Sequence, residues 1–183
     1  MIQVAVLIIT SILLIAISWK SLRKPNSHGF YRFFVWEAIA ALVVIDAPVW
    51  FKSPASWNQI ISWILLIACF VPLGFGVQSL RTQGKPTEQR AGDSSLMSFE
   101  KTTQLVTSGI YHYIRHPLYS SLLLLAWGVF FKSISWIGGL LTVIATLFLF
   151  ATAKADETEC IRYFGDEYQT YMQYTKRFIP YFV

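Results

Sequence analysis

The chain has 183 residues, of which 55% are hydrophobic and only 14% are charged, and its mean hydropathy is +0.49. A soluble domain of average composition carries about 25% charged residues, so this composition excludes an ordinary soluble protein and predicts an integral membrane protein. The net charge of +5 gives no reason to expect a nucleic-acid partner, because basic residues gather on one side of a membrane protein.

Five apolar stretches reach, or nearly reach, the roughly 20 residues that a helix needs to cross the hydrocarbon core. They are Ile2–Trp19, Phe33–Phe51, Trp57–Leu80, Leu118–Phe131 and Ile134–Ala153. The first is interpreted as a spanning helix and not as a signal peptide, because no basic residue precedes it and no small-x-small cleavage site follows it. The predicted fold is all-α, a polytopic membrane helix bundle of about five transmembrane helices with a C-terminal amphipathic cytoplasmic helix.

The distribution of lysine and arginine predicts the orientation. Basic residues are concentrated after the first stretch, between the third and fourth stretches and in the tail, whereas the two short turns carry only Lys52 and Lys132. The positive-inside rule then puts the N-terminus outside and the long segments and tail in the cytoplasm. We expect a multi-pass protein of a prokaryotic inner (cell) membrane with its active site facing the cytoplasm.

This pattern divides the chain into two regions. Residues 1–80 are predicted to form a three-helix N-terminal membrane region. Residues 81–183 are predicted to carry the functional motifs, on a cytoplasmic loop, a two-helix hairpin and a C-terminal lid helix. The oligomeric state stays open.

The thiols and the intramembrane carboxylates show no metal or disulfide pattern. Cys69 lies within the third stretch and Cys160 in the tail, so neither a disulfide nor a metal site is expected. Glu37 and Asp46 are nine residues apart in the second stretch, so they face opposite sides of a helix. We interpret each as a group near the interface beside a basic neighbour, although an intramembrane carboxylate is a functional candidate by default.

The most informative stretch runs from Leu105 to Tyr119, LVTSGIYHYIRHPLY, where a polar segment becomes an apolar helix. Pro117 suits the first position of a helix, because its φ is fixed and it lacks the N–H that would have no partner there. Arg115 and His116 immediately precede this helix start. Free backbone N–H groups and two cationic side chains together predict an anion-binding site at the membrane surface. The fourth stretch is short for a span, which indicates a pocket nearby.

The tail from Lys154 onward differs from the spans. Apolar and aromatic residues recur at three- and four-residue spacing, and acidic residues dominate the remainder. This pattern predicts an amphipathic cytoplasmic helix. Helices that lie in the membrane interface usually carry a basic polar face, whereas this one is acidic and should prefer a cationic surface. The tail is therefore predicted to fold back over Arg115 and His116.

A ligand with both a carboxylate and a positive charge would match this arrangement. Its carboxylate would face Arg115, His116 and the helix N-terminus, and its cation would face Asp156 or Glu157 and nearby tyrosine rings. S-adenosylmethionine has this layout of charges. In the alternative, structural interpretation the tyrosines belong to an interfacial belt, the Arg/His pair binds lipid phosphate and the acidic pair caps the tail.

Two motifs in this order also resemble a known superfamily. The run LVTSGIYHYIRHPLY, two spans, an acidic pair and then FGDEYQTYMQYTKRFIP are similar to the C-terminal half of the isoprenylcysteine carboxyl methyltransferase and phospholipid methyltransferase superfamily. The resemblance covers about Thr103 to Tyr181, while the first three stretches match only in hydrophobicity. It implies an integral membrane methyltransferase without a Rossmann domain, whose S-adenosyl-L-methionine cofactor lies at the cytoplasmic ends of the last helices, under the C-terminal segment.

The resemblance also implies site residues. The cofactor-contacting positions would be Thr103, Gln104, Leu105, Val106, Tyr111, His116, Pro117, Leu118, Tyr119 and Asp156. The candidate catalytic residues are Arg115, Glu157 and Tyr119, and either of the last two could take a proton from an amine nucleophile. Methyl transfer from a sulfonium requires no metal, so none is expected.

One departure from the superfamily pattern concerns the substrate. The prenylcysteine enzymes have an arginine one turn before the acidic pair, thought to hold a substrate carboxylate, and this chain has Thr152 there. Asp156 also replaces the first glutamate of the pair. The expected substrate is a lipophilic or small amphiphilic molecule among the membrane lipids, whose amine, thiol or carboxylate nucleophile is not held by an ion pair at position 152.

Two other classes of function remain open. A membrane NAD(P)H-dependent reductase of the sterol type shares the helical C-terminal architecture but needs further polar groups for its phosphorylated dinucleotide. A non-enzymatic lipid-binding protein needs no cofactor. Equilibrium binding of S-adenosylhomocysteine and of NADPH distinguishes the three classes.

Overall fold

The computed structural model describes residues 2–87 and 96–182, and this part of the chain is helical with no regular β-strand. Its α-helices are α1 (Ile2–Leu22), α2 (His28–Asp46), α3 (Trp57–Ala68), α4 (Phe70–Gln83), α5 (Pro117–Phe130), α6 (Trp136–Phe164) and α7 (Asp166–Tyr174). Short 3₁₀ turns are η1 (Ala47–Val49), η2 (Ser98–Glu100) and η3 (Gly109–His112). The predicted all-α fold is confirmed.

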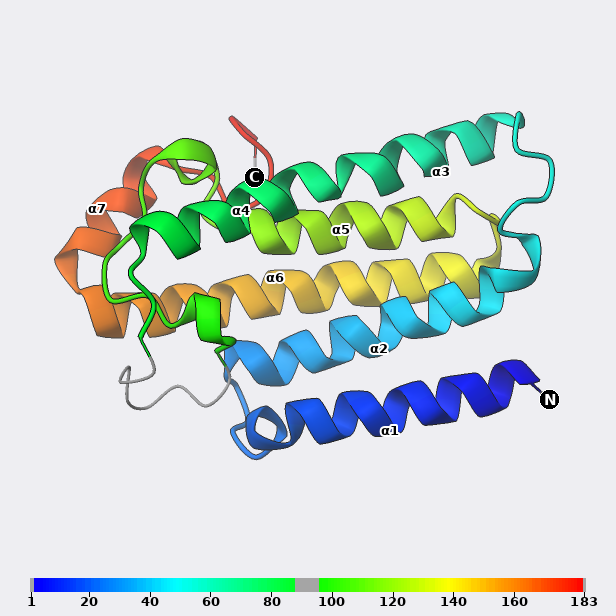
Figure 1. The fold of residues 1–183 in the computed structure, drawn as a ribbon, viewed down its shortest axis with the longest axis horizontal. Coiled ribbons are helices and arrows are strands. Elements are labelled where there is room, and N and C mark those ends of the chain that lie inside the picture. Colours follow the sequence, from blue (N-terminus) through cyan, green and yellow to red (C-terminus); the bar gives the residue numbers. More distant parts are fainter. Residues whose placement is uncertain (1, 88–95, 183) are drawn as a thin grey trace.

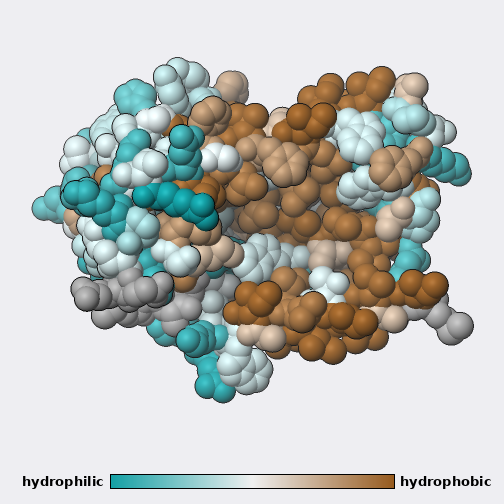
Figure 2. Space-filling model, viewed as in Figure 1, coloured by the Kyte–Doolittle hydropathy of each residue, from teal (hydrophilic) through white to brown (hydrophobic). Residues whose placement is uncertain are grey.

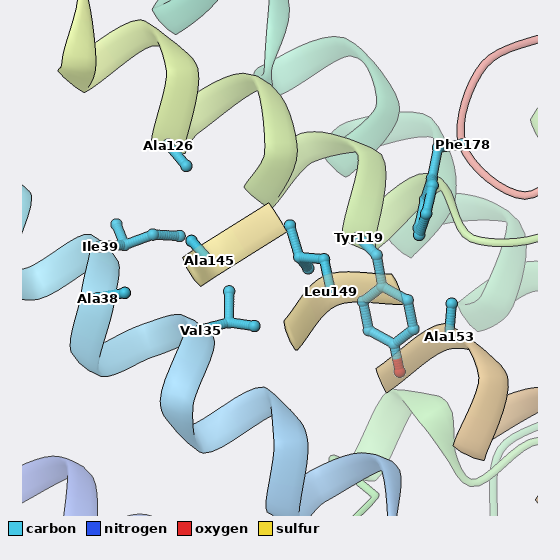
Figure 3. Packing of buried hydrophobic residues seen from close by; sticks show 9 residues of the cluster. All are labelled: Val35, Ala38, Ile39, Tyr119, Ala126, Ala145, Leu149, Ala153 and Phe178. Atoms are coloured by element: carbon cyan, nitrogen blue, oxygen red, sulfur yellow. The ribbon is translucent and has the colours of Figure 1, made fainter. Parts of the chain in front are cut away.

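The long helices lie side by side along the long axis of the molecule, and α7 lies at one end (Figure 1). α2, α5 and α6 pack against one another, α3 and α4 pack against α5, and α1 packs against α2. The main core cluster joins the three central helices through Val35 and Ala38 of α2, Ala126 of α5, and Ala145 and Leu149 of α6 (Figure 3). Small side chains at these contacts let the backbones approach closely, which is typical of helix packing in membranes.

The surface agrees with a position in a membrane. Figure 2 shows hydrophobic residues across the middle of the face in view and hydrophilic residues toward both ends. Within the described residues, three helical elements are long and apolar enough to cross a bilayer: α1, the continuous stretch Trp57–Gln83 of α3 and α4, and α6. α5 is a shorter apolar helix of 14 residues, and α2 has 19 residues. The protein is a helical membrane bundle, and the five-span count and its orientation stay predictions.

The last long helix extends further than the sequence pattern predicts. The pattern predicts a span that ends at Ala153 and a new helix from Lys154, but α6 continues without interruption over Trp136–Phe164. No proline or glycine lies between residues 153 and 164, so backbone hydrogen bonding carries through the change from apolar to acidic side chains. The helix ends at Gly165, whose φ of +63° is accessible to glycine without strain, and α7 begins at Asp166.

The two carboxylates of α2 have surroundings that differ from the predicted basic neighbours. Glu37 accepts a hydrogen bond from the Ser11 hydroxyl of α1 at 2.7 Å, which ties the outermost helix to the bundle. Asp46 is buried at the end of α2. One oxygen of each carboxylate is buried without a hydrogen-bond partner among the described residues. Both carboxylates belong to α2 and do not line the cavity next to the motif that the sequence singles out.

Candidate active site

The motif that precedes α5 consists of a turn, an extended segment and a helix start. The 3₁₀ turn η3 begins at Gly109, which takes a φ of +63° that an L side chain rarely adopts. His116 occupies the position before the helix, and Pro117 is its first residue, as predicted. The first backbone N–H groups of α5 have no partner within the helix and point outward beside Arg115 and His116.

The C-terminal segment lies directly against this motif. We call residues 175–178 the strap. The backbone N–H of Arg115 donates to the carbonyl of Lys176 at 2.7 Å, and the N–H of His116 donates to the carbonyl of Arg177 at 3.0 Å. The two segments also form one isolated parallel β-bridge. The tail therefore folds back over the motif as predicted, although its last helix starts later than expected.

A cavity of about 680 Å³, including its open mouth, lies between the start of α5, the end of α6 and α7. Further lining comes from the end of α4, from η2 and from the segment that leads to η3. The lining includes most of the residues predicted from the sequence, namely Leu105, Val106, Tyr111, Arg115, His116, Pro117, Leu118, Tyr119 and Asp156.

Three predicted residues lie outside this lining. Thr103 and Gln104 are exposed, and the Thr103 hydroxyl donates to the carbonyl of Lys85 at 3.0 Å. Their buried neighbour Thr102 contributes to the cavity wall instead. The third residue, Glu157, is buried beside the cavity and faces the strap.

Glu157 is the centre of a buried ion-pair cluster. Arg115 donates to Oε1 from Nε at 3.0 Å and from Nη2 at 2.8 Å. Arg177 of the strap donates to Oε2 from Nη2 at 2.8 Å. The remaining Arg115 nitrogen donates to the backbone carbonyls of Met172 and Thr175. Glu157 thus connects the strap to the motif. Each side-chain nitrogen of Arg115 donates a hydrogen bond to another group of the protein.

Asp156, the other member of the acidic pair, faces the cavity. The Tyr119 hydroxyl donates to Oδ2 at 3.1 Å, and Nδ1 of His116 lies 3.4 Å from the same oxygen. The rings of His116 and Tyr119 stack, with 5.2 Å between their centroids. Cys160, one turn further along α6, lies 3.7 Å from Oδ1. The carboxylate is therefore oriented by three neighbours while it remains part of the cavity wall.

The His116 imidazole is buried between the two acidic residues. Burial alone would lower the pKa of His116, but hydrogen bonding and charge attraction from Asp156 and Glu157 outweigh it, so the pKa is raised above its usual value. Nε2 lies 3.5 Å from Glu157 and has no hydrogen-bond partner among the described residues. A protonated His116 together with Arg115 and Arg177 faces two carboxylates. The acidic residues of α6 thus lie against the cationic segment before α5, as predicted, and the charges of the site are nearly balanced.

Tyrosines from two elements form an aromatic wall. Tyr111 of η3 and both Tyr168 and Tyr171 of α7 line the cavity and are buried. The Tyr171 hydroxyl donates to the Tyr111 carbonyl at 2.6 Å, which joins α7 to η3. Burial raises the pKa of Tyr111 and of Tyr168 well above the usual value for a phenol. These rings stay neutral, and a neutral aromatic wall suits an apolar or cationic ligand group.

The loop wall of the cavity depends on a long-range ion pair that the sequence does not reveal. Glu100 of η2 lines the cavity, and its two oxygens accept hydrogen bonds from Nη1 of Arg32 at 2.9 and 3.0 Å. Arg32 belongs to α2, is buried and lies over the Trp36 ring at 5.1 Å from its centroid. The partners are 68 positions apart, so no local spacing signal connects them. An N-terminal helix thus supports the wall of a site that otherwise comes from the C-terminal half.

Comparison with known families identifies the region that carries this site. Residues 78–167 match the family described as phospholipid methyltransferase. The part of the chain that carries the site is therefore similar to this family. The matched region runs from α4 to the start of α7 and contains both the segment before α5 and the acidic pair of α6. The resemblance predicted from these two motifs is confirmed. The chain has no significant match among curated proteins or among solved structures.

The match to the phospholipid methyltransferase family indicates a membrane methyltransferase of the superfamily that also includes the isoprenylcysteine carboxyl methyltransferases. The matched region does not contain the whole site. Arg32 precedes it and Arg177 follows it, although both form ion pairs with residues of the matched region. Neighbouring segments therefore complete the site that the family region carries.

Proposed function

We propose that the protein transfers the methyl group of S-adenosyl-L-methionine to a lipophilic or small amphiphilic substrate dissolved in the membrane. The match to a methyltransferase family supports the reaction class. The observation that carries the proposal further is the cavity itself, where the first turn of α5 and the Asp156 carboxylate border the same space.

The cavity residues fit the charges of this cofactor. His116 offers a buried Nε2 that makes no hydrogen bond among the described residues, and with the N–H groups of the first turn of α5 it would hold a carboxylate. Asp156 would attract an ammonium or sulfonium group, and the faces of Tyr111 and Tyr168 would contact a cation or an aromatic base. Arg115 would act mainly through its position, because Glu157 and backbone carbonyls accept its hydrogen bonds.

The bound cofactor supplies an electrophilic methyl group on a sulfonium centre. The protein therefore needs chiefly to align the acceptor group and to exclude water. Burial of His116, Tyr119 and the two tyrosines of α7 supports exclusion of water. The Tyr119 hydroxyl lines the cavity and donates to Asp156, so it is the better candidate for handling a proton from an amine or thiol acceptor. Glu157 fits a positioning role, because two arginines hold its oxygens.

The substrate would reach the cavity from the bilayer. α5 begins at the cavity and runs through the apolar middle of the molecule, so a lipid-dissolved molecule and a water-soluble cofactor can approach from different phases. Thr152, at the position of the carboxylate-binding arginine, is fully buried and donates its hydroxyl to the Phe148 carbonyl at 2.7 Å. It provides no charge, so the proposed acceptor is an amine, a thiol or a carboxylate that is held elsewhere.

Equilibrium binding to the detergent-purified protein tests the cofactor. S-adenosylhomocysteine is expected to bind and NADPH is not, because the cavity wall has no cluster of basic groups for a phosphorylated dinucleotide among the described residues. The opposite result would favour a sterol-type reductase. Binding of neither ligand would favour a non-enzymatic lipid-binding role.

Methyl-labelled cofactor tests the substrate class. The purified protein is offered a membrane lipid extract and, separately, a farnesylcysteine analogue. Label is expected in the lipid extract. Robust labelling of the farnesylcysteine analogue alone would contradict the inference from Thr152, and labelling in neither sample would contradict the proposed activity.

A further inference from the structure

The residues that follow the strap present apolar side chains that no other described residue covers. Ile179 is 49% exposed, Tyr181 82% and Phe182 83%, whereas the preceding Phe178 is 3% exposed. Aromatic side chains at the ends of membrane helices are typical of contact with the interfacial region of the bilayer. Exposed apolar groups clustered in this way mark an interaction surface.

Phe178 determines the depth of this segment in the bundle. Its ring meets the Phe150 ring edge-on, with 4.9 Å between centroids. It also belongs to the core cluster that includes Leu149 and Ala153 (Figure 3). These residues lie in the apolar part of α6, before the first charged residue at Lys154. The chain therefore leaves Phe178 at the level where the apolar part of the bundle ends.

The backbone after Phe178 shows that an aromatic residue occupies a strained position. The N–H of Phe182 donates to the carbonyl of Ile179 at 3.2 Å, which closes a turn. Pro180 holds the second position of the turn, and Tyr181 holds the third with a φ of +69°. Glycine or asparagine usually occupies a third position with positive φ. The turn itself does not require an aromatic residue there, and Tyr181 is largely exposed.

Basic residues stand next to the aromatic ones. Lys176 is exposed and the Arg177 side chain is 36% exposed. Basic residues beside aromatic residues are typical of segments that lie in the interface of an anionic bilayer. Arg177 also pairs with Glu157, so the strap connects this surface to the ion-pair cluster.

We propose that residues 179–182 form an interfacial anchor, which inserts into the headgroup region of an anionic bilayer and holds the strap against the cavity. Phe178 and Arg177 connect the anchor to the core and to Glu157. Because the strap carbonyls accept hydrogen bonds from the backbone before α5, membrane contact stabilises the closed cavity. Any effect of this anchor on cofactor binding rests on the proposed function, whereas the insertion of residues 179–182 into the bilayer does not depend on it.

Spin labels on the full-length protein in anionic nanodiscs test the insertion. The label is attached at Phe182→Cys in a Cys69→Ser, Cys160→Ser background. A label at Leu140→Cys, whose side chain is 62% exposed on the apolar part of α6, gives the lipid-facing reference, and one at Gln169→Cys on the exposed face of α7 gives the water-facing reference. The ratio of oxygen to nickel-chelate accessibility at 182 should lie between the references at 140 and 169, as expected for the headgroup region. Accessibility equal to that at 169 would overturn the proposal.

Amide hydrogen exchange, measured on protein that keeps both native cysteines, gives an independent test. Tyr181→Gly keeps the turn, because glycine adopts positive φ freely, and removes the ring, whereas Tyr181→Trp keeps an interfacial ring. In nanodiscs, exchange at the amides of Arg115 and His116, which donate to the strap, should rise several-fold in Tyr181→Gly and stay near wild type in Tyr181→Trp. In detergent, where no anionic bilayer is present, the difference in amide exchange between the two variants should be smaller. Equal exchange in the two variants in nanodiscs would overturn the anchor.

The same variants separate this inference from the proposed function. Faster exchange in Tyr181→Gly with weaker S-adenosylhomocysteine binding supports both. Faster exchange in a protein that binds no S-adenosylhomocysteine in any variant supports the anchor and contradicts the cofactor proposal.

Discussion

Replacing Glu157 by glutamine should release the strap while the helical bundle stays folded. Glu157 is 5% exposed and pairs with Arg115, whose side chain is 8% exposed. Neutralising one partner of a buried ion pair costs about 3–5 kcal/mol, because the other charge stays buried without compensation. Arg177 is 36% exposed, so solvent screens its pair and its share is about 1 kcal/mol or less.

The loss should appear as local opening of the strap together with the segment before α5, because Glu157 holds both to α6 whereas the central helices are held by apolar packing. At 1.4 kcal/mol per factor of ten, about 3–5 kcal/mol corresponds to roughly a hundredfold to several thousandfold in the opening equilibrium. Native-state hydrogen exchange reports this change directly. The amides of Arg115 and His116 donate to strap carbonyls, so their exchange should accelerate by about this factor.

Two matched controls make the result specific. Arg177→Ala should accelerate the same amides by less than about tenfold, since it removes only the screened pair. Asp156→Asn changes the adjacent residue, which contacts Tyr119 and His116 and does not pair with an arginine in the described structure, so it should leave strap exchange unchanged. The assignment of Glu157 as the centre of the cluster would be refuted if Glu157→Gln exchanged like wild type or like Arg177→Ala.

Three further predictions concern charge, pH and orientation. Asp156→Asn should weaken S-adenosylmethionine binding by about 1.5–3 kcal/mol, roughly tenfold to a hundredfold, and binding of the uncharged-sulfur product less; equal losses for both ligands would place their shared ammonium group at Asp156, and no loss for either would contradict the charge contact. The pKa of His116 is raised in the folded protein, so its stabilisation is complete below the unfolded pKa of about 6.5 and is lost as pH rises through the folded value. The thermal unfolding midpoint of the wild type, relative to that of His116→Gln, should therefore fall between pH 6 and pH 9. If the two midpoints changed with pH in parallel, His116 would not contribute this stabilisation. Reporter fusions at the C-terminus and in the Lys52–Ser56 turn should report opposite compartments, whereas a shared compartment would show that the five-span orientation is wrong.

Local patterns in the sequence were enough to predict the helices and the helix start of the site. Apolar stretches predict helices in a membrane because every backbone polar group must be satisfied within the segment. Pro117 predicts a helix start because it suits only the first turn of a helix. The boundary at Lys154 was wrong, because a change of polarity does not break a helix, and α6 ends only at Gly165.

Only the tertiary structure decided which acidic side chain serves the cavity. Asp156 and Glu157 are adjacent, so their side chains point about 100° apart on the helix, and the sequence alone allowed either one to face a ligand. The rotation of α6 in the bundle turns Asp156 to the cavity and Glu157 to the strap, where Arg177 meets it from 20 residues away. Pairings of this kind depend on how helices pack and where the chain returns. Composition and periodicity therefore determined that this is a helical membrane protein with a motif before α5, while the division of roles within the site required contacts between distant segments.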